Sequence, residues 1–420
     1  MSLSLGGKAV EICTLALLAT VVPRVLGPAD YGRFSVPLTI VTLGSLAMTL
    51  GGPTLMARFV PAAAVDERVA TAKAIGARLA RGRALQVLAI AAAAGLVIVA
   101  APNAISPFAT TTVVVALALN VAATLALQVA LGLGRTGAWS FRYPVQNAVL
   151  VGAVLLLHSP YGSRGAVSAI LVSAIAAAGF AAWVTLPILR TPAPRVPVPA
   201  GAIRFGVHQA AGAAFTQLSQ RGSVLAVALL AGSTLETGYA ALATGIALGI
   251  TYAVLQTFTV SLTHLADSDD HGVAEAVLQR LATALLAVLV PSTIVGVVVL
   301  RDVVPVVFGD DYVGAVDAFV PALALVVLAP LHSLLVQAAA LRMQGGVAAT
   351  AGAVSAVVFV AASLVAVPTW AATGGTAASL AGGVAGSMVA IRLLPGAAGG
   401  RIVAASMAGV AAVLAVGFAT

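Results

Sequence analysis

Charged residues are scarce in this chain, and their scarcity excludes most classes of protein. Only 8% of the 420 residues are Asp, Glu, Lys or Arg, against about 25% in an average soluble domain. So few charges could not supply the polar surface of a soluble globule of this size. The 61% share of apolar residues excludes disorder as well, because disordered chains are poor in apolar side chains. The class that remains is a polytopic integral membrane protein.

Patterns for disulfides, metals and nucleotides are also missing. The single cysteine, Cys13, excludes a disulfide scaffold and a cysteine-based metal site. No GxxxxGK[ST] loop occurs, and the GxGxxG match at residues 132–137 follows an apolar span rather than a strand. The acidic segment 267–278 lacks the glutamate that an EF-hand needs at its twelfth position. We therefore expect no cofactor, no metal and no ATP hydrolysis.

Long apolar runs are abundant. Residues 84–134 are 51 in a row without a charge, and the segment from Pro102 to Pro107 divides them into two spans. A helix crosses roughly 30 Å of hydrocarbon with about 20 apolar residues, and continuous runs favour helices over the alternating strands of a membrane barrel. The runs predict an all-α membrane protein of about 13 spans, arranged as two six-helix lobes plus one extra C-terminal transmembrane helix.

The distribution of basic residues predicts the orientation. With a cytoplasmic N-terminus, sixteen of the 21 Lys and Arg residues fall on the inner side and four fall outside, as the positive-inside rule requires. The composition is typical of a GC-rich bacterial genome, so we expect a multi-pass protein of the bacterial cytoplasmic membrane. No basic patch carries interleaved aromatics, which argues against nucleic acid as a partner. The basic stretch 66–83 predicts a short amphipathic helix at the membrane surface.

A proline-rich segment and a short repeat predict two similar halves. Residues 190–204 carry four prolines, typical of an extended, semi-rigid linker. Residues 26–34 and 231–239 share a glycine, a short turn, an acidic residue and a second glycine beside an aromatic residue, which indicates an internal repeat typical of transporters. The predicted domains are an N-terminal lobe (1–189), a cytoplasmic linker (190–204), a C-terminal lobe (205–394) and an additional helix (395–420).

Four segments resemble, in order, the motifs of a known family. They are residues 22–32, 220–239, 308–312 with the pattern Phe-Gly-x-x-Tyr, and 368–378 with its proline and paired glycines. Together they are similar to the polysaccharide transport, O-antigen flippase-like branch of the multidrug/oligosaccharidyl-lipid/polysaccharide flippase superfamily. Ser223 departs from the pattern, because many relatives have an aspartate there.

The resemblance implies two six-helix lobes around a central cavity that opens alternately to each side. It also implies that the chain, rather than acting as an enzyme, exports an undecaprenyl-pyrophosphate-linked glycan to the outer leaflet for cell-surface polysaccharide such as lipopolysaccharide. The expected partners are this lipid-linked glycan, the lipid bilayer and other membrane proteins of polysaccharide assembly.

A pyrophosphate-linked headgroup needs fixed positive charge and hydrogen-bonding groups within the membrane. Arg221 lies about 16 residues into its span, near the middle of the membrane, and Gln217 shares its helix face at i, i+4. The arginine fork suits bidentate contact with phosphate. The other candidates for substrate binding are His208, Gln209, Arg24, Arg58, Arg142 and Gln146. For Arg24, Arg58 and Arg142, ordinary anchoring at the membrane surface is the alternative interpretation.

Glu11, an acid within the first span, is the candidate for ion coupling, with a structural ion pair as the alternative. It also supports a second hypothesis, an ion-coupled antiporter for drugs or organic cations from the same superfamily. A third hypothesis is a membrane-embedded polysaccharide polymerase. Such an enzyme needs a sizeable outer loop, and the longest predicted outer segment, residues 301–316, is short. The prominence of Arg221 over Glu11 favours an anionic substrate.

Overall fold

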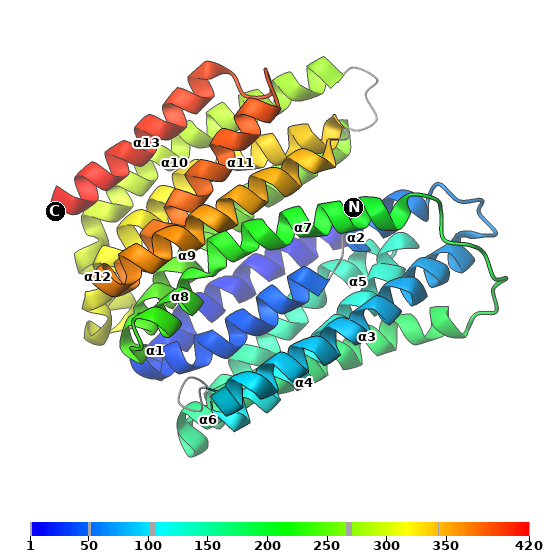
Figure 1. Cartoon of the computed structure of the whole chain (residues 1–420), viewed down its shortest axis with the longest axis horizontal. Coiled ribbons are helices and arrows are strands. Elements are labelled where there is room, and N and C mark those ends of the chain that lie inside the picture. The colour runs from blue at the N-terminus through cyan, green and yellow to red at the C-terminus, as the bar shows by residue number, and fades with distance from the viewer. Residues whose placement is uncertain (1, 49–51, 101–105, 266–270, 343, 420) are drawn as a thin grey trace. The chain divides into compact units, whose positions relative to one another are not determined.

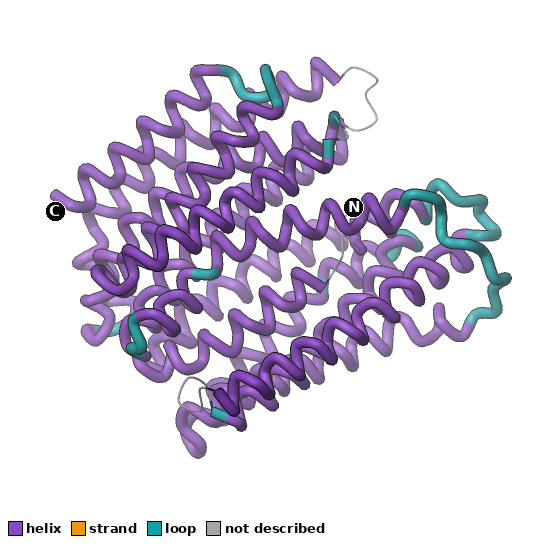
Figure 2. Tube along the Cα trace, in the orientation of Figure 1, coloured by secondary structure: helices purple, strands orange, loops and turns teal. Residues whose placement is uncertain are grey.

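Helices are the only extended secondary structure in the described part of the chain. This computed structural model describes residues 2–48, 52–100, 106–265, 271–342 and 344–419. Within these ranges no strand occurs, and short loops join the helices (Figure 2). Among the residues described, eight helices are long and apolar enough to cross a membrane. The predicted all-α, polytopic membrane fold is therefore confirmed, since a helix satisfies its backbone hydrogen bonds internally and needs no water to do so.

The helices belong to two compact units. Unit 1 comprises Met1–Leu26 and Pro37–Ala211, and unit 2 comprises Gly27–Val36 and Gly212–Thr420. The helices of unit 1 are α1 (Ser2–Met48), α2 (Gly52–Phe59), α3 (Arg68–Ala100), α4 (Pro107–Gly132), α5 (Thr136–Ser140) and α6 (Arg142–Arg190) (Figure 1). Those of unit 2 are α7 (Ala202–Arg221), α8 (Ser223–Leu230), α9 (Thr234–Leu265), α10 (His271–Phe308), the 3₁₀ helix η1 (Asp310–Ala315), α11 (Val316–Leu341), α12 (Gly345–Leu393) and α13 (Gly400–Ala419). Both α1 and α7 contribute residues to each unit.

Breaks within the long helices reveal the repeat. The backbone leaves helical geometry at Gly27 in α1 (φ 68°), Gly162 in α6 (φ 56°) and Ala371 in α12 (φ 42°). Both α6 and α12 have 49 residues, and both α4 and α11 have 26. Gly27 and Gly232 (φ 65°) are 205 positions apart and share a left-handed φ. These correspondences support the predicted internal repeat.

Each unit has its own apolar core. In unit 1, Leu55, Met56, Ile75 and Val129 form a buried aliphatic cluster that joins α2, α3 and α4. In unit 2, α11 is the central helix, because it packs against α9, α10, α12 and α13 and 89% of its most apolar stretch is buried. Helices that are apolar on every face are expected in such central positions.

The basic stretch 66–83 does not form a separate surface helix, so that prediction is wrong. Helix α3 runs without a break from Arg68 to Ala100, and no proline interrupts it. The charged residues therefore occupy the first turns of a helix that continues into the apolar run. One of them, Lys73, donates from Nζ to the carbonyl oxygens of Leu189 (2.8 Å) and Thr191 (2.5 Å) at the end of α6. Cations are favourable at this end of a helix, where carbonyl groups lack helical partners.

The segments that carry the family resemblance meet in unit 2. Residues 27–36 approach the start of α9 so closely that a Cβ atom at Gly32 would lie 2.0 Å from the carbonyl oxygen of Thr234. In the same way, a Cβ atom at Gly238 would lie 1.9 Å from the carbonyl oxygen of Pro28. Only glycine fits positions where two backbones come this close.

The remaining two motif segments join the same group. The Tyr239 hydroxyl donates to the carbonyl oxygen of Asp311 at 3.0 Å, within the Phe-Gly-x-x-Tyr turn. The Glu236 carboxylate accepts a 3.1 Å hydrogen bond from the amide of Ala372, directly after the break in α12. A carboxylate is a favourable partner for the free amides at the start of a helical segment. All four motifs therefore have a structural role, because they hold one region of unit 2 together.

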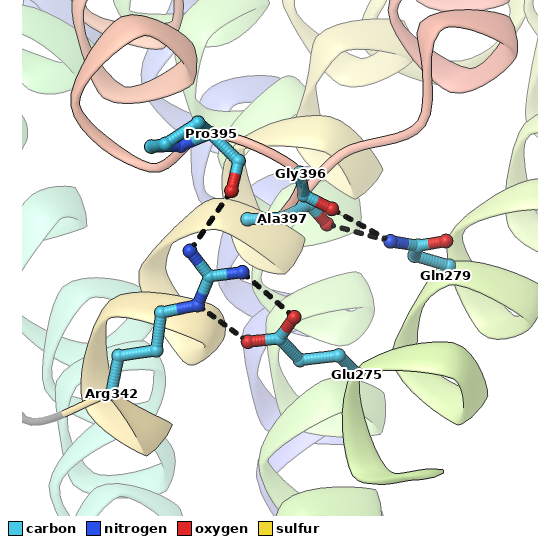
Figure 3. Close-up of polar contacts among 6 residues, drawn as sticks. All are labelled: Glu275, Gln279, Arg342, Pro395, Gly396 and Ala397. Atoms are coloured by element: carbon cyan, nitrogen blue, oxygen red, sulfur yellow. Dashed lines mark hydrogen bonds and ion pairs between the residues drawn. The ribbon is translucent and has the colours of Figure 1, made fainter. Parts of the chain in front are cut away.

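An ion pair anchors the loop before α13 (Figure 3). Arg342 donates from Nε to Oε1 of Glu275 at 2.6 Å and from Nη2 to Oε2 at 2.8 Å, and its Nη1 donates to the carbonyl oxygen of Pro395 at 3.1 Å. The Glu275 hydrogen bonds raise the pKa of Arg342 above its ordinary value. Gln279 Nε2 donates to the carbonyl oxygens of Gly396 and Ala397 at 3.2 and 3.1 Å. Helices α10 and α11 thus both hold the loop that leads into α13.

Arg342→Gln is expected to lower the free energy of unfolding by about 1–2 kcal/mol, because a bidentate, charge-assisted pair at low exposure exceeds an ordinary surface pair. The check is a double-mutant cycle with Glu275→Gln, measured by chemical or thermal unfolding of the detergent-solubilised protein. The second substitution should add little to the first. Fully additive effects would contradict the pairing.

Candidate functional site: two polar groups within the helices

Arg221, the main candidate from the sequence, ends α7 beside the Gly222 junction to α8. Its Nε donates to Oε1 of Gln217 one turn earlier at 2.8 Å, and Gln217 Nε2 donates to Oε1 of Gln220 at 3.4 Å. Nine residues, about 14 Å of helix, separate Arg221 from the end of α8 at Leu230. This is about half of the hydrocarbon thickness. The hydrogen bond between Arg221 and Gln217 shows that the structure brings these two residues together, as the i, i+4 spacing predicts.

Unit 1 contains a buried polar seam between α4 and α6. Gln146 Nε2 donates to Oδ1 of Asn120 at 3.0 Å, and Arg142 Nη1 contacts Oγ1 of Thr124 at 3.5 Å. The partners are four residues apart on both helices and run in opposite order, so the seam follows one face of an antiparallel pair. Gln128 continues the stripe on α4. It is fully buried, and among the described residues its amide oxygen and nitrogen have no hydrogen-bond partner.

Arg142 carries positive charge into this seam. Arg142 is only 8% exposed. Its guanidinium carbon lies 4.6 Å from the ring centroid of Trp139 and 4.0 Å from that of Tyr143. Within the described ranges, no carboxylate forms an ion pair with it. Aromatic faces and a hydroxyl stabilise a cation without neutralising it. Its partner Thr124 lies eight residues, about 12 Å, before the end of α4, so the charge lies well inside the helical bundle.

The other predicted residues are dispersed. Glu11 is buried on α1 with 1% of its surface exposed, and the Thr14 hydroxyl donates to its backbone carbonyl at 3.0 Å. Arg24 on α1 and His208 on α7 are exposed. Arg58 and Gln209 lie in α2 and α7, but their side chains fall outside the described part of the structure.

Ser223, at the position where many members of the resembled family have an aspartate, forms a neutral hydrogen bond. Its hydroxyl pairs with that of Thr244 at 2.8 Å, and both residues are buried. A hydroxyl pair satisfies both groups without a cation, whereas an ionised aspartate would need one. The departure seen in the sequence is therefore accommodated by Thr244, and this position carries no charge for ion binding.

Sequence reasoning missed Asn120, Thr124 and Gln128. A signal was present, because these are the polar residues spaced at i, i+4 and i+8 within an otherwise apolar run, and such residues share one helix face. Trp139 and Tyr143 were missed as well, because their spacing from Arg142, three residues before and one residue after it, does not by itself predict the ring contacts that the structure shows. Together these residues surround Arg142 with aromatic and polar side chains.

The fold and these two polar groups define a polytopic α-helical membrane protein that carries positive charge within its helices. No protein-family model matches the sequence, and no curated protein matches it.

Solved structures, in contrast, match over nearly the whole chain. The lipid II flippase MurJ, in an inward closed conformation, has a TM-score of 0.72 at 9% identity, over 98% of this chain and 91% of that one. The MATE transporter VcmN of Vibrio cholerae has a TM-score of 0.60 at 14% identity, over 93% and 96%. An inward-facing multidrug-resistance MATE transporter of the MOP superfamily has a TM-score of 0.56 at 14% identity, over 94% and 95%. The chain therefore has the fold of the MOP-superfamily transporters.

Proposed function

We propose that this chain is a transporter that flips an isoprenoid-pyrophosphate-linked oligosaccharide from the inner to the outer leaflet of the bacterial cytoplasmic membrane. It works by alternating access, serves cell-surface polysaccharide assembly, and has its N-terminus in the cytoplasm. The observation that carries the proposal is Arg142, a buried cation whose described partners are two aromatic rings and one hydroxyl. A neighbour of the same fold is named as a lipid II flippase, which supports a lipid-linked substrate.

The buried charge of Arg142 calls for an anionic ligand. An unneutralised charge inside a membrane protein is expensive and marks a functional position. A substrate headgroup with two phosphates supplies the missing negative charge. The Asn120 and Gln146 amides of the same seam can bind sugar hydroxyls, since amides both donate and accept.

Arg221 supplies the corresponding charge in unit 2. Gln217 orients the Arg221 guanidinium by accepting a hydrogen bond from Nε, and a guanidinium is a suitable group for contact with a phosphate. The lipid tail can stay in the bilayer, so only the headgroup needs these polar groups.

Arg221→Ala is expected to slow flipping about tenfold or more, because a hydrogen bond to a charged group contributes about 1.5–3 kcal/mol. The assay uses liposomes that contain the protein and a fluorescent undecaprenyl-pyrophosphate-linked sugar, with accessibility of the outer leaflet followed over time. Arg33→Ala is the matched control, since the Arg33 side chain is 55% exposed and forms an i, i+3 ion pair with Asp30 within α1. Movement equal to that in protein-free liposomes would contradict the function. Movement unchanged by Arg221→Ala would contradict the site.

A second candidate function is ion-coupled antiport of organic cations, which the buried Glu11 favours. In that case the same liposomes would show proton-driven uptake of a fluorescent organic cation, and Glu11→Gln would abolish it. Under the flippase proposal, wild-type liposomes show no such uptake.

A further inference from the structure

An outward-facing groove between α10 and α13 is separate from both polar groups described above. It has a volume of about 610 Å³ and is lined mainly by small or apolar side chains, within the size range of ligand pockets. Its exposed lining residues include Thr283 and Ala287 from α10 and Ala405 and Ala408 from α13. The groove exists because alanine occupies α13 positions where longer side chains would fill the space.

The two helices that form the groove are parallel and in register. Gln279 on α10 bonds the carbonyl oxygens of Gly396 and Ala397, just before α13. Further along, a Cβ atom at Gly409 would lie 2.8 Å from a methyl carbon of Val290, and one at Gly417 would lie 3.0 Å from a methyl carbon of Val297. Each of these α10 residues thus lies beside an α13 residue about 120 positions later in the sequence. A constant offset is expected for two parallel helices, because both rise by the same distance per residue.

This register places two arginines at the same end of the groove. Arg401 lines the groove at the start of α13. Arg280 lies on the same face of α10 as Thr283 and Ala287, which follow it by three and seven residues. In this register, the part of α13 beside Arg280 lies within one turn of Arg401. Both side chains belong to exposed residues. From Arg401, the lining of α13 continues to Ala412, which is about 16 Å of helix and close to half of the hydrocarbon thickness of roughly 30 Å.

We propose that this groove binds one anionic phospholipid of the leaflet in which α13 begins, with the phosphate at Arg280 and Arg401 and one acyl chain between α10 and α13. The charge of the two arginines matches an anionic headgroup. The apolar groove matches the depth of one leaflet, and it opens outward, where lipid surrounds the helices. This inference does not rest on the proposed transport function.

The test is native mass spectrometry of the full-length protein in detergent, titrated separately with dimyristoyl phosphatidylglycerol and dimyristoyl phosphatidylcholine. These lipids share their acyl chains and differ in net charge. A basic residue near an anionic headgroup contributes about a fivefold gain in affinity, so the two arginines together should favour phosphatidylglycerol about 30-fold. The double variant Arg280→Gln/Arg401→Gln should bind both lipids alike.

Two control variants, Ala404→Phe and Arg190→Gln, distinguish lipid binding in the groove from effects of added bulk or lost charge elsewhere. Ala408→Phe fills the groove and should weaken phosphatidylglycerol at least tenfold, whereas Ala404→Phe, an exposed position outside the lining, should not. Arg190→Gln removes an exposed arginine from unit 1 and should leave binding unchanged. Equal affinity of the wild type for both lipids would overturn the proposal, as would unchanged binding in Ala408→Phe. Displacement of the bound lipid by undecaprenyl phosphate at equal concentration would overturn the phospholipid as occupant and assign the groove to an isoprenoid.

Discussion

Replacing Arg142 with methionine is expected to remove most of the flipping activity without loss of stability. The guanidinium is buried against Trp139 and Tyr143, and the described residues offer it no carboxylate. Methionine has a similar length and fills irregular apolar spaces. It also removes a buried charge, whose desolvation cost offsets what its contacts contribute. Replacing a purely structural arginine would not abolish activity while leaving stability intact, so this substitution tests the functional role directly.

The expected loss is about tenfold to a hundredfold in the rate of flipping, which corresponds to one charge-assisted contact with the substrate. It is measured with the pyrophosphate-linked probe in liposomes, beside the melting temperature of each purified variant. Arg142→Lys should retain part of the activity, because it keeps the charge but loses the planar fork. Arg164→Gln, an exposed position near the break in α6, is the control. A methionine variant that is less stable but equally active would make Arg142 a structural residue.

The second large effect concerns the contact between residues 27–36 and the start of α9. Gly32→Ala is expected to lower the free energy of unfolding by about 3 kcal/mol, at the upper end of the usual cost of overpacking. The added Cβ would lie 2.0 Å from the carbonyl oxygen of Thr234, and a backbone atom cannot rotate away as a side chain can.

Gly249→Ala is the matched control for this prediction. Gly249 lies in α9 of the same unit, and a Cβ there would meet no atom within 4 Å. The control should therefore raise stability by up to about 1 kcal/mol through helix propensity. Thermal unfolding of the purified protein checks both, and the Gly32 variant should melt about 3–4 °C below the wild type, as the unfolding entropy of a 420-residue chain implies. Equal melting temperatures for the two variants would show that the close approach is not maintained in the protein.

The sequence was most informative where one physical requirement dominates. Charge-free runs longer than 20 residues can satisfy the bilayer only as helices, so the helical class and the two spans on either side of Pro102 and Pro107 were predictable. The i, i+4 spacing of Gln217 and Arg221 was sufficient for their hydrogen bond, because both residues lie on one uninterrupted helix.

Contacts between distant segments were less predictable. Asn120 and Thr124 on α4 meet Gln146 and Arg142 on α6 only because the two helices pack antiparallel in one register. Sequence spacing alone does not fix that register. The continuation of α3 from Arg68 to Ala100 was missed for another reason. A charged, amphipathic stretch is equally compatible with a short separate helix and with the first turns of a long one.

The division of α1 between the two units has a consequence for biosynthesis. Residues 27–36 belong to unit 2, yet the ribosome makes them about 200 residues before their partners at the start of α9, which at ordinary rates of synthesis is roughly 10–40 s. During that interval residues 27–36 have no other part of unit 2 to pack against. Unit 2 is complete only when residues 27–36 pack against the residues of unit 2 that are made later, 212–420. Unit 1 and unit 2 therefore cannot fold strictly one after the other. If synthesis stopped in the proline-rich segment, the chain would contain residues 27–36 without the remainder of unit 2.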